Sequence, residues 1–240
     1  MQRRASARNS SARPGGVRPG LRGNPRGGSP HGHGNSHGKS HGNSRGDKLR
    51  RVLAQEAARI MAQHGIHDYL TAKRKAAERL AFTDFGALPS NTEIEAALVE
   101  YQRLFDAGGH ALSLQSQREA ALHAMHWLAE FEPRLVGPVL SGTATEHADI
   151  QLHLFADRPE NVTLQLMDRG VAHEVTERRV RLDAERIKAF PGLRFEVGNR
   201  RIDATVFPRD GIRQAPVSPV DGRPMRREDA AELEALMEHP

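Results

Sequence analysis

Residues 47 to 132 carry apolar side chains at the three- and four-residue spacing of amphipathic helices. Asp47 has the character of an N-cap at the start of the first run. Ser90 and Glu93 have the spacing of a capping box before another run. The pattern predicts four helices, over residues 47–64, 68–81, 90–105 and 112–131.

After Pro133 the apolar positions alternate with polar ones, as they do in half-buried strands. The alternation predicts five strands, over residues 134–137, 149–155, 171–182, 193–197 and 201–207. Residues 159–168 return to helical spacing, and an acidic amphipathic helix is expected over 227–238 after a turn-rich segment. A helical half followed by this order of elements predicts an α+β fold with a mixed sheet.

Residues 1–46 differ in composition from the rest of the chain. They hold eight Arg, one Lys, no acidic residue and eleven of the 22 Gly. Such a segment cannot bury enough apolar surface to offset its loss of chain entropy, so we expect it to be disordered. The chain therefore divides into four expected regions, which are a basic tail (1–46), a helical region (47–132), an α+β core (133–210) and a turn-rich segment with a C-terminal helix (211–240).

The basic character of the chain comes from this tail. The whole chain has 35 basic and 30 acidic side chains; without the nine basic residues of the tail, 26 basic residues remain and the net charge becomes −4. A basic globular surface for nucleic acid is therefore not expected. The tail itself is expected to bind polyanions weakly and with a strong dependence on salt.

The absence of cysteine excludes disulfides, thiolate metal sites and a catalytic thiol. It fits a reducing compartment, and we expect the protein to be cytoplasmic. No apolar run approaches the ~20 residues that a membrane helix needs, so no membrane partner is expected.

One strand of the core carries the candidate chemistry. Alternation over residues 149–155 places Asp149, Gln151 and His153 on one face and Ile150, Leu152 and Leu154 on the other. The strand over 201–207 likewise places Asp203 and Thr205 on one face. Carboxylate and amide oxygens are ligands for hard cations, so Asp149, Gln151 and Asp203 are candidate ligands for Mg²⁺.

The stretch before this strand resembles a known nucleotide-binding signature. Gly137-Pro138, Gly142-Thr143 and Asp149-Ile150-Gln151-Leu152 have the residue spacing of the DNA polymerase beta-like nucleotidyltransferase superfamily. The resemblance implies a nucleotidyltransferase-like core in which Asp149, Gln151 and Asp203 are the catalytic, metal-holding positions for divalent cations. It further implies that a nucleoside triphosphate lies on a turn formed by Gly137, Ser141, Gly142 and Thr143, and that a nucleotidyl group passes to an acceptor hydroxyl.

Two positions depart from the family pattern. Pro138 replaces the serine that helps to hold the triphosphate, which removes a hydroxyl and a backbone N–H donor. Gln151 replaces the second aspartate, which removes one negative charge from a site that depends on carboxylates. Because this transfer relies on electrostatic stabilisation with the metals in place, we expect its rate to be lowered by orders of magnitude.

Two hypotheses of different class follow. The first is a nucleotidyltransferase-like protein that binds Mg²⁺ and nucleoside triphosphate, with impaired transfer to an unknown acceptor. The alternative is a non-catalytic protein-interaction module on a degenerate nucleotidyltransferase fold.

Arginines crowd the last three strands, and their role stays open. If several of them converge near Asp149, they would bind triphosphate or an anionic acceptor. The arginines in question are Arg178, Arg179, Arg181, Arg194, Arg200, Arg201, Arg209 and Arg213. If they spread over the sheet, they form a solvated face.

Overall fold

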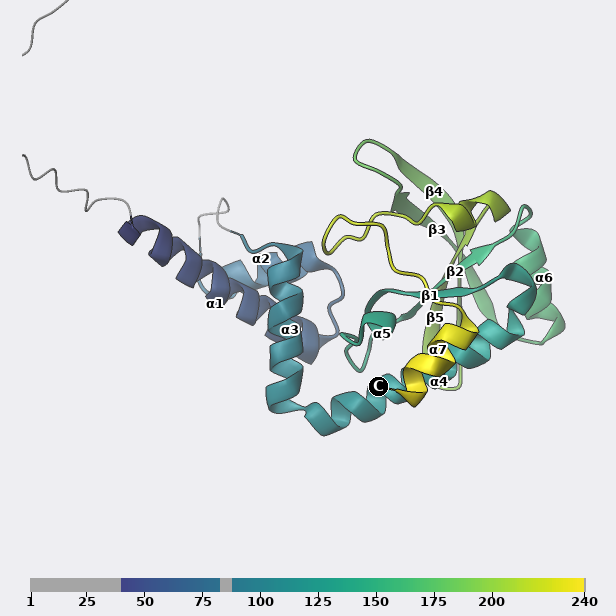
Figure 1. The fold of residues 1–240 in the computed structure, drawn as a ribbon, viewed down its shortest axis with the longest axis horizontal. Helices are drawn as coiled ribbons and strands as arrows, with labels where there is room; N and C mark the ends of the chain where they lie inside the picture. The colour runs from purple at the N-terminus through teal and green to yellow at the C-terminus, as the bar shows by residue number, and fades with distance from the viewer. Residues whose placement is uncertain (1–39, 83–87, 240) are drawn as a thin grey trace, which may run out of the picture. The chain divides into compact units, whose positions relative to one another are not determined.

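The computed structural model describes residues 40–82 and 88–239. Disorder was expected over residues 1–46, and residues 1–39 of that segment lie outside the described part. One compact unit spans Lys39–Pro240. Within it, a group of helices precedes an α+β core, as the periodicity predicted (Figure 1).

The helical region consists of α1 (Ser40–His64), α2 (Tyr69–Arg79), α3 (Asn91–Phe105) and α4 (Ala107–Trp127). The first three pack around their own apolar cluster, which contains Leu53, Ala57, Ala76 and Ile94, all essentially inaccessible to solvent. The predicted cap at Ser90 is confirmed as a capping box with Glu93.

The starts of α1 and α4 differ most from the prediction. Residues 40–46 were expected in the tail, with Asp47 as the N-cap, but α1 already begins at Ser40. Once the packed part of the helix has nucleated, each added turn costs little free energy. Gly108 and Gly109 were expected to separate two helices, yet they lie in the first turn of α4 because only Asp106, at φ −153°, breaks the helical backbone.

The sheet has five strands in the order β1-β2-β5-β4-β3. They are β1 (Arg134–Val136), β2 (Ile150–Phe155), β3 (His173–Arg181), β4 (Ile187–Val197) and β5 (Arg200–Phe207). Only β2 and β5 pair in parallel, so the sheet is mixed, as expected. The short helix α5 (Gly137–Ser141) follows β1, and α6 (Glu160–Asp168) follows β2.

Strand β4 is longer than the predicted 193–197 segment, because Pro191 lowers the strand signal without interrupting the sheet. Pairing between β4 and β5 begins only at Gly192, one residue later. Toward β3, Pro191 lies opposite Glu177 in a hairpin that continues to Ile187. A proline at the point where pairing with one neighbour begins removes no hydrogen bond to that neighbour.

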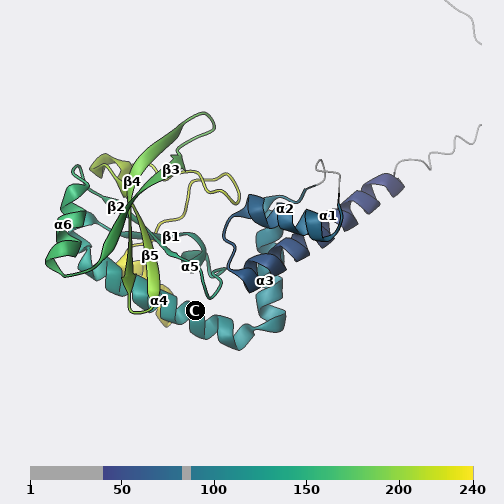
Figure 2. The ribbon, with the colours of Figure 1, turned by 180° about the vertical axis from the view of Figure 1, so that it is seen from behind.

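One face of the sheet carries the main core. Ile150, Leu152 and Leu154 of β2 are fully buried there, which confirms the predicted alternation. Helix α4 and the C-terminal helix α7 (Ala230–Glu238) lie side by side along this layer (Figures 1 and 2). Leu233 of α7 is fully buried in the same cluster.

The other face of the sheet is divided into a polar end and an aromatic end. Phe155, Phe190 and Phe207 form a separate small cluster at the aromatic end. The polar end holds the candidate site residues. No helix in the described ranges is long and apolar enough to cross a membrane.

Candidate functional site

Parallel pairing of β2 with β5 brings the candidate ligands together. Gln151 lies directly opposite Asp203 in the register of the two strands. Partners in register point to the same face, and Asp149 precedes Gln151 by two residues on that face. Asp149, Gln151 and Asp203 therefore lie on one surface, although Asp203 is about fifty positions away from the other two in the sequence.

Gly137 makes close contact with the site possible. Its backbone is left-handed, with φ +71°, and a Cβ atom placed there would lie 2.6 Å from Oε1 of Gln151. Any other residue would be strained by the positive φ and would also displace the Gln151 amide. Gly137 thus allows the turn after β1 to lie against the side chain of Gln151.

At the turn that follows α5, hydroxyl groups are presented to the surroundings, whereas the backbone N–H groups donate hydrogen bonds within the turn. The backbone N–H groups of Gly142, Thr143 and Ala144 all donate to the carbonyl oxygen of Pro138. The Ser141 and Thr143 hydroxyls lie 3.0 Å apart, and Thr143 donates to a carboxylate oxygen of Glu95 at 3.1 Å. Of the predicted phosphate-turn residues, Gly142 therefore shapes the turn, and Ser141 and Thr143 present the polar groups.

These residues line a cavity of about 680 Å³. Its walls include six of the seven candidate residues, namely Gly137, Ser141, Thr143, Asp149, Gln151 and Asp203, with Gly142 outside. The helical region and the loop over residues 218–226 close it from other sides. A volume in this range suits a nucleotide-sized ligand.

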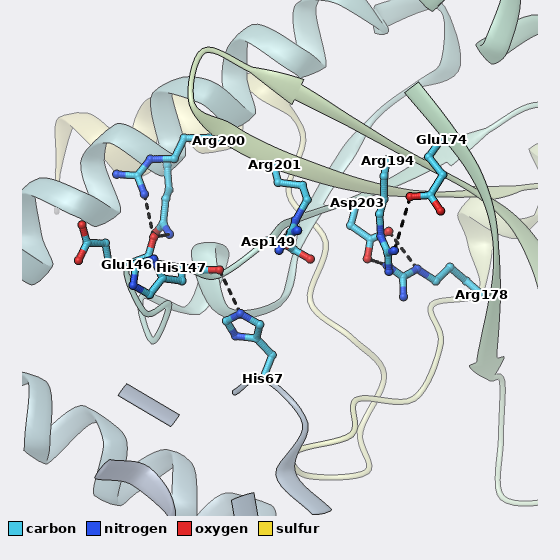
Figure 3. A network of polar contacts seen from close by, with 11 residues as sticks. His67, Glu146, His147, Asp149, Glu174, Arg178, Arg194, Arg200, Arg201 and Asp203 are labelled. Carbon is cyan, nitrogen blue, oxygen red and sulfur yellow. Dashed lines mark hydrogen bonds and ion pairs between the residues drawn. The ribbon is translucent and has the colours of Figure 1, made fainter. Parts of the chain in front are cut away.

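Hydrogen bonds fasten the helical region to the core around this cavity. Buried Gln102 of α3 donates to the carbonyl oxygens of Thr143 and Ala144, at 3.3 and 3.1 Å. His67 contacts the carbonyl oxygen of His147 at 3.0 Å, which Figure 3 shows.

Burial and the nearby Glu95 raise the pKa of Tyr69 in the cavity wall to about 12, so its phenol stays a hydrogen-bond donor.

Both candidate carboxylates are held by arginines (Figure 3). Asp149 accepts from Nε of Arg201 at 2.5 Å. Asp203 is paired with Arg178 through two nitrogens, and Nε of Arg178 lies 2.9 Å from Oδ1. Of the arginines on the last three strands, Arg178 and Arg201 therefore converge on the candidate site.

Arg178 reaches Asp203 across an intervening strand. Arg178 belongs to β3 and Asp203 to β5, with β4 between them. Gly192 of β4 has no side chain at the crossing point, and a Cβ atom there would lie 3.0 Å from Cγ of Arg178. The missing side chain of Gly192 makes room for the guanidinium to cross the sheet.

The expected magnesium ligands lie together, but their chemistry does not fit a pair of divalent ions. Each carboxylate is already neutralised by a guanidinium, and the third donor is the neutral amide of Gln151. No three His, Asp or Glu side chains within residues 40–82 and 88–239 are grouped closely enough to hold a metal ion. Hard cations with several retained waters depend on carboxylate charge, which is balanced here.

His153 was expected to share the polar face, and it has a structural role at the boundary with the aromatic end. Its Nδ1 accepts a hydrogen bond from Nε of Arg227 at 3.0 Å, and Phe207 contacts it edge-on. Burial, together with the adjacent Arg227 charge, lowers the pKa of His153 to about 3. The ring is therefore neutral and joins the segment before α7 to the sheet.

Sequence reasoning missed Glu95 and Gly192. Glu95 is one of many acidic residues on a helix, and only the packing of α3 against the turn brings it to Thr143. Gly192 follows a proline within an apolar run and reads as an ordinary turn signal. The one available clue was the alternation in β4, which places Gly192 on the same face as Arg194.

Neither a scan against the profiles of known protein families nor a search of curated proteins found a match to this chain. The function must therefore be inferred from the fold and the cavity.

Proposed function

We propose that the cavity binds a nucleoside triphosphate on a nucleotidyltransferase-like core. The observation that carries this proposal is the pairing of Gln151 with Asp203 in parallel strands, with Asp149 beside them, at the wall of a cavity of about 680 Å³. The turn from Gly137 to Thr143 lines the same cavity. This placement supports the proposal, because the resemblance to the superfamily implies that these residues share one site.

The cavity has separate surfaces for the two halves of a nucleotide. Arg178 and Arg194 enter it from the sheet and suit phosphate oxygens. Met61, Tyr69 and Leu98 enter it from the helical region and offer an apolar and aromatic surface for a base. Ligand sites of this kind combine mostly apolar walls with a few placed polar groups.

We further propose that nucleotidyl transfer to an acceptor is weak in this protein. Pro138 supplies neither the hydroxyl nor the N–H of the family's serine, and Gln151 contributes no charge. The amides of residues 142–144 are used within the turn and do not replace these donors. Binding without efficient transfer is the role that these substitutions support.

Calorimetric titration of the full chain with ATP, GTP and adenosine, in buffer containing Mg²⁺, tests the proposal. ATP or GTP is expected to bind at least about tenfold more tightly than adenosine, because the charged groups contact phosphate. Tyr69→Ala is expected to weaken this binding, since the variant loses the aromatic surface proposed for the base. Tyr101→Ala, which removes the tyrosine that does not line the cavity, is the matched control.

Lack of binding at millimolar nucleotide would contradict the proposal. Retention of a stoichiometric protein partner by the same preparation would then favour the non-catalytic interaction module.

A further inference from the structure

We propose that arginines take the place of the metal ions in this cavity, so that the site binds nucleotide phosphate without a divalent cation. In this arrangement Arg178 and Arg194 supply positive charge to the phosphates, and Arg201 neutralises Asp149. The inference rests on the proposed nucleotide binding and concerns how that site holds its ligand. Three features of the cavity wall support it.

The first feature is the fixed orientation of Arg178. Asp203 binds it through two nitrogens, and only 10% of the Asp203 side chain and 30% of the Arg178 side chain are exposed. A guanidinium has five N–H donors, so this pairing leaves others free while the carboxylate fixes the plane of the group. Because Arg178 lines the cavity, its remaining donors are available to a ligand there.

The second feature is an unsatisfied donor on Arg194. Arg194 lies opposite Asp203 in the β4–β5 register and lines the cavity. Its Nε is buried and has no hydrogen-bond partner. The salt-bridge partner of Arg194, Glu174, is 3.8 Å away through another nitrogen. Because Arg194 lines the cavity and its side chain is 37% exposed, the terminal nitrogens of its guanidinium can donate to a phosphate oxygen there.

The third feature is the balance of charge. Asp149 and Asp203 are matched by Arg201 and Arg178, and Arg194 lies beside them with Glu174 3.8 Å away. Burial lowers the pKa of Arg178, the neighbouring Arg194 lowers it further, and Asp149 opposes both. An anion placed between the two guanidiniums would relieve their repulsion, whereas Mg²⁺ would have to displace a partly buried guanidinium from its carboxylate.

The decisive experiment is calorimetric titration of the full chain with ATP in excess EDTA and, separately, in excess MgCl₂. Affinity in EDTA is expected to stay within about threefold of the affinity in MgCl₂. Inorganic tripolyphosphate is expected to compete with ATP in EDTA, because phosphate is the group recognised. Binding that appears only with MgCl₂ would overturn the inference and leave nucleotide binding intact, and absence of binding in both buffers would overturn both proposals.

Substitutions test whether the two cavity arginines, rather than other charged residues of the sheet, hold the phosphates. Arg194→Met and Arg178→Lys are each expected to weaken ATP binding in EDTA about tenfold, and Arg178→Lys keeps a positive charge beside buried Asp203 so that the fold is preserved. Arg186→Met removes an exposed Arg–Asp pair at the turn of the same hairpin, outside the cavity, and is expected to bind like the unaltered protein. Unchanged affinity in both cavity variants, with folding verified by circular dichroism, would refute the role of the arginines.

Discussion

The neutral, buried ring of His153 predicts a specific loss of stability in mild acid. Its side chain is 6% exposed, it accepts a hydrogen bond from Arg227, and its pKa is lowered from 6.5 to about 3. In the unfolded chain the ring takes up a proton near pH 6.5, whereas the folded protein excludes that proton. The stabilising effect is thus fully present above pH 6.5 and is lost as the pH falls below it.

The size of the effect follows from proton linkage. Each pH unit between the two pKa values costs about 1.4 kcal/mol, so the free energy of unfolding should fall by about 2 kcal/mol between pH 7 and pH 5. This part of the loss depends little on the folded pKa, provided that it lies below about 4. The main physical cause is burial of the ring, which disfavours its charged form. The guanidinium of Arg227, which lies over the rings of Phe155 and Phe207, adds a smaller repulsion.

Urea unfolding at pH 7 and pH 5, followed by circular dichroism, measures this loss. His153→Asn keeps a hydrogen-bond acceptor toward Arg227 but cannot titrate. It should be less stable at pH 7, because it loses the edge contact with Phe207, and its loss between pH 7 and pH 5 should be smaller than that of the unaltered protein by about 2 kcal/mol. Equal losses in the two proteins would show that His153 is not held neutral in the folded state.

Three further predictions concern the cavity. Gly137→Ala should lower the free energy of unfolding by about 1 to 3 kcal/mol in urea titrations, because φ is +71° and the new Cβ meets Gln151; an unchanged midpoint would contradict this geometry. Gly192→Ala should displace Arg178 and weaken ATP binding several-fold in calorimetry, whereas Gly108→Ala, where a Cβ has no neighbour within 4 Å, should not. Gln151→Asp adds a third carboxylate and should create Mn²⁺ binding, measured by electron paramagnetic resonance, that the unaltered protein lacks; no Mn²⁺ binding by the variant would show that the sheet face cannot be converted to a metal site.

Local sequence patterns were sufficient to predict the helices and strands themselves. The alternation in residues 149–155 and 201–207 predicted which side chains of β2 and β5 face the main core, because successive side chains of a strand point to opposite faces whatever the strand pairs with. It did not predict that His153, Asp203 and Thr205 on the opposite face are buried as well. The capping box at Ser90 was likewise readable, since both partners lie within one helical turn. The starts of α1 and α4 could not be predicted in this way. Propagation from the packed part extends α1 through Gly42 and Gly46, and α4 includes Gly108 and Gly109 because only Asp106 leaves the helical conformation.

Local sequence patterns were enough to place Asp149, Gln151 and Asp203 on polar strand faces near a glycine turn, since these are properties of short segments. The folded chain was needed to show that Gln151 lies opposite Asp203, that Arg178 crosses β4 over Gly192, and that α3 contributes to the cavity wall. Strand order, register and helix docking depend on the packing of distant segments, which no local pattern encodes. In the folded protein the predicted metal ligands line a cavity, and their two carboxylates are paired with arginines.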